Sequence, residues 1–87
     1  MEIRKWATAG TMQSSDLTVQ VEPADRLEVV IDSTVKKQFE HLIRARVDEV
    51  LARHAVTSGR ISITDRGALD YAIEARVEAA LRRAAEA

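Results

Sequence analysis

The chain has 87 residues, which is the length of a single domain spanning residues 1–87. Its 13 Lys and Arg against 14 Asp and Glu leave a net charge of -1, whereas nucleic-acid binders usually carry a basic surface. The absence of cysteine excludes disulfides, thiolate metal sites and a protein thiol as nucleophile. The longest apolar run is only Val29–Ile31, and residues 1–6 lack the apolar stretch of a secretory signal. We therefore expect a soluble cytoplasmic protein that binds neither membrane nor nucleic acid.

Four short segments show the alternation of apolar and polar residues that is typical of β-strands. They are residues 3–9, 17–21, 27–31 and 60–64. The segment 22–26 contains the only proline, which presets φ and lacks the N–H that a central strand needs, so a turn is predicted there. The side chains expected to face the core are those of Leu17, Val19, Val21, Leu27, Val29, Ile31, Ile61 and Ile63.

Two further segments, residues 34–55 and 68–85, carry apolar residues at offsets of three and four, which predicts amphipathic helices. Asp32 or Ser33 is positioned to cap the first helix and Asp65 the second, because their side-chain oxygens can accept hydrogen bonds from the free N–H groups at a helix start. The first helix is expected to bury Val35, Phe39, Leu42, Ile43, Val47, Val50 and Leu51. The second is expected to bury Leu69, Ala72, Ile73, Val77, Ala80, Leu81 and Ala84.

The predicted element order is therefore β-β-β-α-β-α. Because every predicted strand alternates, the sheet should have one solvated face and one covered face, which favours antiparallel pairing. Two amphipathic helices are enough to cover that one face. The sequence predicts an α+β fold, a two-layer sandwich with an antiparallel sheet of about four strands and two helices on one side.

The two histidines, His41 and His54, offer little for catalysis. They lie on the same predicted helix about 220° apart around its axis, so they cannot readily share a metal ion or a substrate. The chain has no HExxH, P-loop or GxGxxG motif, and its carboxylates follow helical spacing as solvated faces do. We therefore predict no catalytic residues and no metal ligands, and a protein that is not an enzyme by itself.

One loop attracts attention for a different reason. Residues 10–16, Gly-Thr-Met-Gln-Ser-Ser-Asp, join the first two predicted strands and carry small hydroxyl side chains. One interpretation is a hairpin turn, since Gly, Ser and Asp favour turns, and the other is an exposed serine that accepts a covalent group. A second serine competes for that role, because Asp32-Ser33 resembles the Asp-Ser-Leu attachment motif of phosphopantetheine carriers. Those carriers are helix bundles, however, and a plain helix cap also explains Ser33.

Four blocks of the sequence resemble the citrate lyase acyl carrier protein family, the gamma subunits of that complex. The block Ala9–Asp16 is similar to the family signature Ala-Gly-Thr-Leu-Glu-Ser-Ser/Gly-Asp, with Gln13 standing where the family usually has Glu. The resemblance continues through Asp32–Phe39, Asp65–Asp70 and Glu74–Arg82. Several separate blocks over nearly the whole chain are more specific than any single motif.

This resemblance implies a modified serine, which the family motif assigns to Ser14. The implied prosthetic group is phosphoribosyl-dephospho-coenzyme A, attached through a phosphodiester by a dedicated prosthetic-group transferase that uses a triphosphoribosyl precursor. Such a group would supply the thiol that the chain itself lacks, since a thioester carrier needs one. The protein would then need only an accessible hydroxyl on a rigid hairpin.

The resemblance also implies partner subunits. The alpha subunit, an acyl transferase, would exchange acetate for citrate on the carrier, and the beta subunit, a lyase that would bind magnesium, would cleave the citryl thioester. Two related interpretations stay open: the acyl carrier subunit of malonate decarboxylase and that of citramalate lyase. A third belongs to another class, an assembly module that carries no prosthetic group.

Overall fold

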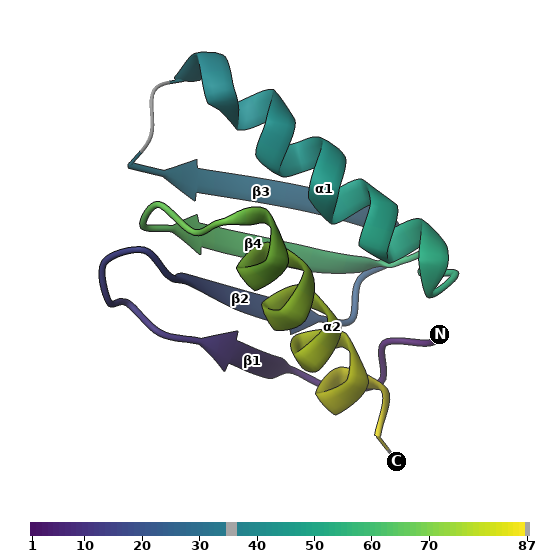
Figure 1. The fold of residues 1–87 in the computed structure, drawn as a ribbon. Coiled ribbons are helices and arrows are strands. Elements are labelled where there is room, and N and C mark those ends of the chain that lie inside the picture. Colours follow the sequence, from purple (N-terminus) through teal and green to yellow (C-terminus); the bar gives the residue numbers. More distant parts are fainter. Residues whose placement is uncertain (35–36, 87) are drawn as a thin grey trace.

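The computed structural model describes residues 1–34 and 37–86 and follows the predicted order of strands and helices (Figure 1). A short 3₁₀ helix, η1, precedes the first α-helix. The strands are β1 (Ala7–Gly10), β2 (Leu17–Glu22), β3 (Leu27–Ser33) and β4 (Gly59–Asp65), and the helices are η1 (Lys37–Phe39), α1 (Glu40–Arg53) and α2 (Asp70–Ala85).

The four strands form one sheet in the order β1-β2-β4-β3. The pairs β1/β2 and β2/β4 are antiparallel as predicted, but β3 and β4 are parallel, so the sheet is mixed and the prediction of an antiparallel sheet was wrong for this pair. The cause is the connection, because α1 crosses over the sheet between β3 and β4 and thereby returns the chain to the same end. The predicted turn at residues 22–26 joins β2 to β3, but β4 lies between those two strands.

Both helices lie on the same face of the sheet, which confirms the predicted two-layer α+β architecture (Figure 1). Helix α2 packs over β1 and β2, and α1 packs beside α2 and against β3. The core lies between the layers, where alternate strand residues meet the apolar stripes of the helices. Its fully buried large side chains are those of Leu17, Val19, Val21, Val47, Val50, Leu51, Ile61, Ile63, Val77 and Leu81.

The first strand is shorter than the predicted segment 3–9. It begins only at Ala7, which pairs with Val21, so any extension toward the N-terminus would soon face Pro23, which has no N–H to offer. The chain instead turns toward the end of α2, where the backbone N–H groups of residues 4 and 5 both donate to the carbonyl of Ala84. Ile3 is buried at this junction.

The first long helix begins later than the predicted residue 34. Ser33 still belongs to β3, and the N–H of Thr34 donates to the carbonyl of Asp65 at 3.1 Å, so the parallel ladder extends past the predicted cap. Neither Asp32 nor Ser33 therefore caps α1, whose N-cap is Phe39 without a side-chain hydrogen bond. The backbone of Ser33 and Thr34 therefore forms sheet hydrogen bonds with β4 in place of the helical hydrogen bonds that the local sequence favours.

The apolar stripes of the helices are mostly buried as predicted, but their first residues are not. Phe39, Leu42 and Leu69 are exposed, and so is Leu27 at the start of β3. The predicted place of Val35 on the stripe lies outside the described residues. Each exposed position lies at or beside the start of its element, so periodicity alone overestimates the length of the covered stripe.

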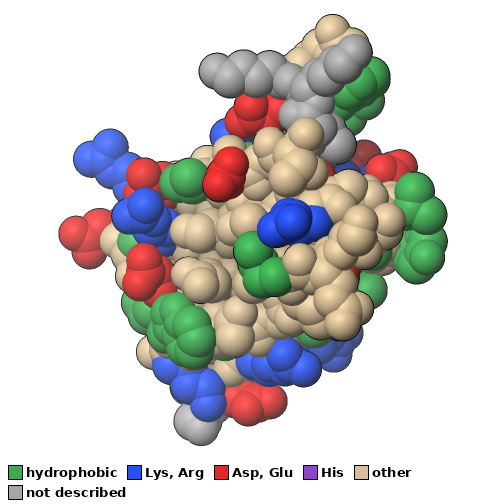
Figure 2. All heavy atoms as spheres, turned by 90° about the vertical axis from the view of Figure 1, so that its left-hand side faces the viewer, with side chains coloured by type: hydrophobic (Ala, Val, Ile, Leu, Met, Phe, Trp, Pro, Cys, Tyr) green, Lys and Arg blue, Asp and Glu red, His purple; other side chains and the backbone are tan. Residues whose placement is uncertain are grey.

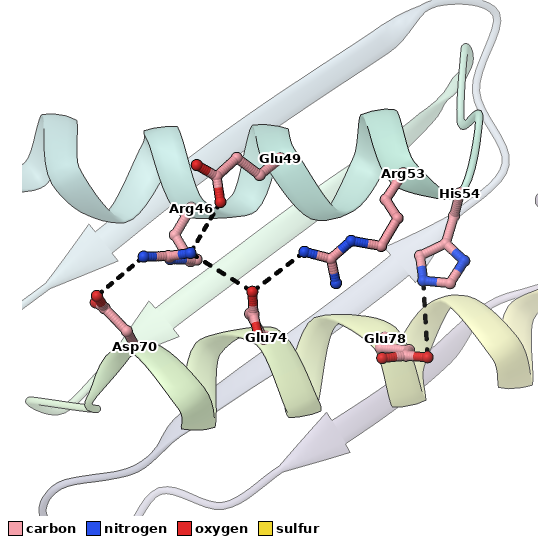
Figure 3. A network of polar contacts seen from close by, with 7 residues as sticks. All are labelled: Arg46, Glu49, Arg53, His54, Asp70, Glu74 and Glu78. Carbon is pink, nitrogen blue, oxygen red and sulfur yellow. Dashed lines mark hydrogen bonds and ion pairs between the residues drawn. The ribbon is translucent and has the colours of Figure 1, made fainter.

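A row of charged side chains joins the solvent-facing edges of α1 and α2 (Figure 3). The guanidinium of Arg46 contacts Glu49 at 2.8 Å, Asp70 at 3.1 Å and Glu74 at 3.5 Å, and Arg53 contacts Glu74 at 3.2 Å. Exposed ion pairs contribute about 0–1 kcal/mol each, so this row mainly orients the two helices over a core that supplies most of the stability. Neither of the described α-helices is long and apolar enough to cross a membrane.

Candidate functional site

The loop between β1 and β2 contains a tight turn with two serines at its centre. The N–H of Asp16 donates to the carbonyl of Gln13 at 3.2 Å, which closes a four-residue turn around Ser14 and Ser15. Ser15 has a φ of 65°, a left-handed conformation that costs a non-glycine residue about 1–2 kcal/mol. The surrounding structure must therefore compensate for this strain, and the predicted hairpin turn is confirmed.

Backbone hydrogen bonds tie this loop to the connection between β4 and α2. The N–H of Ser15 donates to the carbonyl of Arg66 at 2.8 Å, and the N–H of Arg66 donates to the carbonyl of Asp16 at 2.8 Å. This reciprocal pair continues the β2/β4 ladder beyond the register of Leu17 with Asp65. These hydrogen bonds fix the backbone of the strained turn relative to the end of β4.

Asp16 organises the loop through its side chain, which is only 16% exposed. Oδ2 accepts hydrogen bonds from the hydroxyl of Thr11 at 2.5 Å and from Nη2 of Arg76 at 2.9 Å. Oδ1 accepts from the N–H of Leu17 at 2.8 Å and from Nε of Arg76 at 3.2 Å. The Thr11 hydroxyl first, then Arg76 and the Leu17 N–H, lower the pKa of Asp16 from 3.8 to about 2. The group is therefore a carboxylate at any physiological pH.

Ser14 stands apart from these contacts. Its side chain is exposed, and its hydroxyl makes no hydrogen bond with the part of the chain that the structure describes. The neighbouring backbone is held by the Asp16-to-Gln13 hydrogen bond and by the strained Ser15. The loop therefore offers a free primary hydroxyl on a firmly positioned turn, the arrangement that an external enzyme needs to modify it.

Ser33, the competing serine, has a different environment. Its hydroxyl donates to Oδ2 of Asp65 at 2.9 Å, at the end of β3 and away from the start of α1. Asp65 is only 1% exposed and also accepts the N–H groups of Gly67 at 3.2 Å and Ala68 at 2.9 Å. Asp65 was predicted as the N-cap of α2, but that position is Leu69, and the carboxylate instead holds the turn leading into the helix.

Sequence reasoning missed the connecting role of Asp65 and the role of Arg76. A buried carboxylate that joins two strand ends to a turn has no signature beyond the single letter Asp. Arg76 lies 60 positions from Asp16 on a helix with two other basic residues, Arg82 and Arg83, so the sequence carries no signal that selects it.

A groove lies beside the two-serine turn, between it and the first two turns of α2. Its volume is about 360 Å³, and its lining consists of Ser15, Asp16, Tyr71, Ala72, Ala75 and Arg76. Figure 2 faces the end of the molecule to which the β1–β2 loop belongs, where backbone and uncharged polar atoms fill most of the centre around a basic and an apolar side chain, and the other charged and apolar side chains lie toward the rim. The serine loop thus borders a surface hollow.

The two histidines lie apart from this loop. His41 is exposed, and His54 is partly buried at the end of α1, with Nε2 3.7 Å from a carboxylate oxygen of Glu78 (Figure 3). Among residues 1–34 and 37–86, no cluster of three or more His, Asp or Glu side chains could hold a metal ion.

The sequence matches the family model described as ACP: malonate decarboxylase delta subunit (MdcD), over residues 4–84. Two similar curated proteins are named citrate lyase acyl carrier protein. That of Haemophilus influenzae (strain PittGG) is 48% identical over 86 residues, covering 99% of this chain and 90% of the relative. That of Pectobacterium carotovorum subsp. carotovorum (strain PC1) is 52% identical over 87 residues, covering 99% and 91%.

Two solved structures share the fold. A chain of a Pseudomonas malonate decarboxylase hetero-tetramer in complex with malonate superimposes with a TM-score of 0.72 at 23% identity, covering 93% of this chain and 84% of that one. A protein from Thermus thermophilus gives a TM-score of 0.70 at 12% identity, covering 95% and 16%. At these identities the likeness concerns the fold alone, whereas the family model and the curated relatives match the sequence itself. The chain therefore belongs to the acyl carrier protein family of citrate lyase and malonate decarboxylase, a family of carrier subunits that are not enzymes by themselves.

Proposed function

We propose that the chain is the acyl carrier subunit of citrate lyase, a single carrier domain over residues 1–87 with its prosthetic group on Ser14. One observation carries the proposal: Ser14 presents an exposed hydroxyl, free of hydrogen bonds within the described chain, on a turn whose backbone is held in place. That turn lies in a chain 48% and 52% identical to two citrate lyase acyl carrier proteins. The hydroxyl of Ser33 is bonded to Asp65. The side chain of Ser15 is exposed like that of Ser14, and between these two neighbours the family motif selects Ser14.

The residues around Ser14 suit attachment of phosphoribosyl-dephospho-coenzyme A from a triphosphoribosyl precursor. The Oγ atom of Ser14 would form a bond to the phosphorus nearest the ribose, the bond from that phosphorus to the departing diphosphate would break, and the hydroxyl proton would pass to the transferase or to water. The carrier supplies only the hydroxyl in this step. This division explains why the loop holds no general base next to Ser14: the nearby carboxylate of Asp16 is already committed to four hydrogen bonds.

When bound, the prosthetic group supplies the thiol that forms acyl thioesters, which a chain without cysteine cannot provide. The alpha subunit would exchange acetate for citrate, and the beta subunit would release oxaloacetate and restore the acetyl form. The carrier holds its end of the arm at one place on a rigid hairpin, so each active site meets the acyl group at a high effective concentration. We propose that this carrier is a phosphoprotein of citrate fermentation in the cytoplasm, where its lack of cysteine fits a reducing compartment.

A second candidate function is the acyl carrier subunit of malonate decarboxylase. It is favoured by the description of the matching family model and by the fold shared with a malonate decarboxylase chain. The hairpin serine would serve the same purpose there, so only the partner enzymes distinguish the two functions.

The attachment site is tested by incubating the purified chain with the transferase and its triphosphoribosyl-dephospho-coenzyme A substrate, and measuring the intact mass. We expect one prosthetic group on the wild type, on Ser15→Ala and on Ser33→Ala, and none on Ser14→Ala. Incorporation into Ser14→Ala, or loss of incorporation only in Ser33→Ala, would overturn the assignment. An unchanged mass in the wild type under conditions that modify a citrate lyase acyl carrier protein would favour the unmodified assembly module.

The partner enzyme is tested with the loaded carrier. We expect it to support citrate cleavage with the alpha and beta subunits of citrate lyase, and to support malonate decarboxylation poorly with the corresponding malonate decarboxylase subunits. The reverse preference would favour the second candidate function.

A further inference from the structure

The groove described above lies next to Ser14 in the chain, because its lining includes the two residues that follow. Ser15 and Asp16, the next two residues of the chain, line it, and chain geometry keeps the Cα of Ser14 within about 8 Å of the Cα of Asp16. Ser14 itself is not part of the lining, but a group bonded to its hydroxyl starts within reach of this hollow. The first parts of the proposed prosthetic group are a phosphate and a ribose, so the groove would have to accommodate these two.

Arg76 gives the groove an anion-binding character. Its guanidinium has five N–H donors, of which Nε and one on Nη2 are bonded to Asp16, and the other three make no hydrogen bond within the described chain. The side chain is 41% exposed, so these donors can be reached from solvent. Guanidinium groups bind phosphate oxygens well because several N–H groups lie in one plane.

Asp16 repels an incoming phosphate less than a carboxylate without hydrogen-bond partners would. Both of its oxygens accept two hydrogen bonds, one from Arg76 and one from elsewhere in the loop. The carboxylate therefore aims the guanidinium while its own lone pairs are occupied. The lining also includes Ala72 and Ala75, whose short side chains leave room, and the exposed Tyr71.

We propose that this groove seats the phosphodiester and ribose of a group attached to Ser14, with Arg76 as the positioning residue that donates hydrogen bonds to the phosphate oxygens. The inference rests on the proposed function, because it takes Ser14 as the attachment point. Seating the first atoms of the arm fixes the direction in which the rest of it leaves the carrier. The mobile part is then shorter than the whole arm, which concentrates the thiol near the partner active sites.

The first test fills the groove without touching the Asp16–Arg76 pair. Ala75→Leu places a larger side chain in the lining of the groove at an exposed helix position, and Ala45→Leu is the matched control at an exposed position of α1. Each protein is loaded by the transferase, checked by intact mass, and compared with its unloaded form by ¹⁵N NMR. We expect loading to shift the amides of Ala72 and residue 75 and the Nε–H of Arg76 in the wild type, and Ala75→Leu to abolish the shift at Arg76.

The second test changes the charge. We expect Arg76→Gln to lower the ratio of seated to free phosphodiester about threefold, as for an exposed charged contact, measured by ³¹P relaxation of the loaded protein. Arg76→Lys should retain part of the effect, and Arg82→Gln, which removes an exposed α2 guanidinium paired with Glu78, should retain all of it.

The outcomes separate the two proposals. Absence of the mass increase on wild type, or an increase that persists in Ser14→Ala, contradicts the attachment site. A normal mass increase on Ser14, with loading shifts confined to the loop and equal ³¹P relaxation in all variants, overturns the groove assignment alone. A control adds inorganic phosphate to the unloaded protein at the same concentration. If it shifts the Arg76 signal as much as loading does, the groove assignment is also overturned, because attachment to Ser14 would then contribute nothing to binding.

Discussion

At the scale of single residues, the carboxylate of Asp16 connects the stability of the protein to pH. Its pKa is about 2 in the folded chain against 3.8 as a usual value, and the hydroxyl of Thr11 is the main cause. A carboxyl whose pKa is lowered by folding stabilises the native state fully above its unfolded pKa, and this contribution disappears as the pH falls toward 2. The shift corresponds to about 2 kcal/mol.

We therefore predict that the free energy of unfolding falls between pH 4 and pH 2 by about 2 kcal/mol more in the wild type than in Asp16→Asn. The measurement is urea unfolding followed by circular dichroism across this pH range. Parallel pH profiles for the two proteins would show that the hydrogen bonds of Asp16 give it no preference for the charged form.

Asp65 also acts on the scale of single residues. Because it has backbone partners besides Ser33, the stability effects of substituting the two residues can be told apart. In Asp65→Ala, the N–H groups of Gly67 and Ala68 and the Ser33 hydroxyl all lose their hydrogen bond to the buried carboxylate, at partly buried positions. We expect a loss of about 3 kcal/mol in the free energy of unfolding, against about 1 kcal/mol for Ser33→Ala, which leaves the two backbone contacts intact. Denaturant unfolding measures both, and an equal or larger loss in Ser33→Ala would contradict this arrangement.

At the scale of elements, the β1–β2 hairpin needs a glycine at position 10, because a side chain there would clash with the opposite strand. Gly10 has a φ of +99°, and a Cβ there would come within 1.9 Å of the carbonyl oxygen of Leu17, whereas a Cβ at Gly67, at φ +93°, would meet only the Cα of Ser15 at 4.0 Å, an ordinary van der Waals contact. Both positions strain an L-residue, but only the first adds a clash with backbone.

Gly10→Ala should therefore destabilise the protein by about 3 kcal/mol or more, and Gly67→Ala by about 1 kcal/mol. Thermal unfolding measures the difference. Hydrogen exchange should also accelerate at the N–H of Thr11, which donates to the Leu17 carbonyl, in the first variant only. Equal losses in the two variants would show that the unusual backbone angle, and not the clash, decides the cost.

At the scale of the whole molecule, the serine loop projects beyond a core that is complete without it. The buried residues belong to the strands, to α1, to α2 and to the chain segments that contact them, while Thr11 through Ser15 are all exposed. Folding therefore needs no contribution from a group attached to the loop.

We predict that the unloaded protein is folded, and that loading and Ser14→Ala each change its melting temperature by only about 1–2 °C, because an exposed hydroxyl contributes little. Circular dichroism melting of the unloaded, loaded and Ser14→Ala proteins checks this. An unfolded unloaded protein would mean that the attached group is itself part of the fold.

The sequence alone determined the elements and the loop. Alternation identified the strands around Val19, Val29 and Ile61, and helical periodicity identified two helices, because both patterns reflect which neighbouring side chains turn to the same side. The block Ala9–Asp16 singled out the hairpin with its two serines, because turn-forming residues act through local hydrogen bonds.

Only the tertiary structure decided how these parts meet. It placed β4 between β2 and β3 and brought Arg76 to Asp16 across 60 positions. It also kept Ser33 in β3, where its hydroxyl bonds to Asp65 and does not cap a helix. Local patterns specify which face of an element is buried but not which partner covers it. A strand order, a helix start that competes with a sheet ladder, and a groove between a loop and a helix all depend on contacts between distant residues, whose energies are settled only when the whole chain packs.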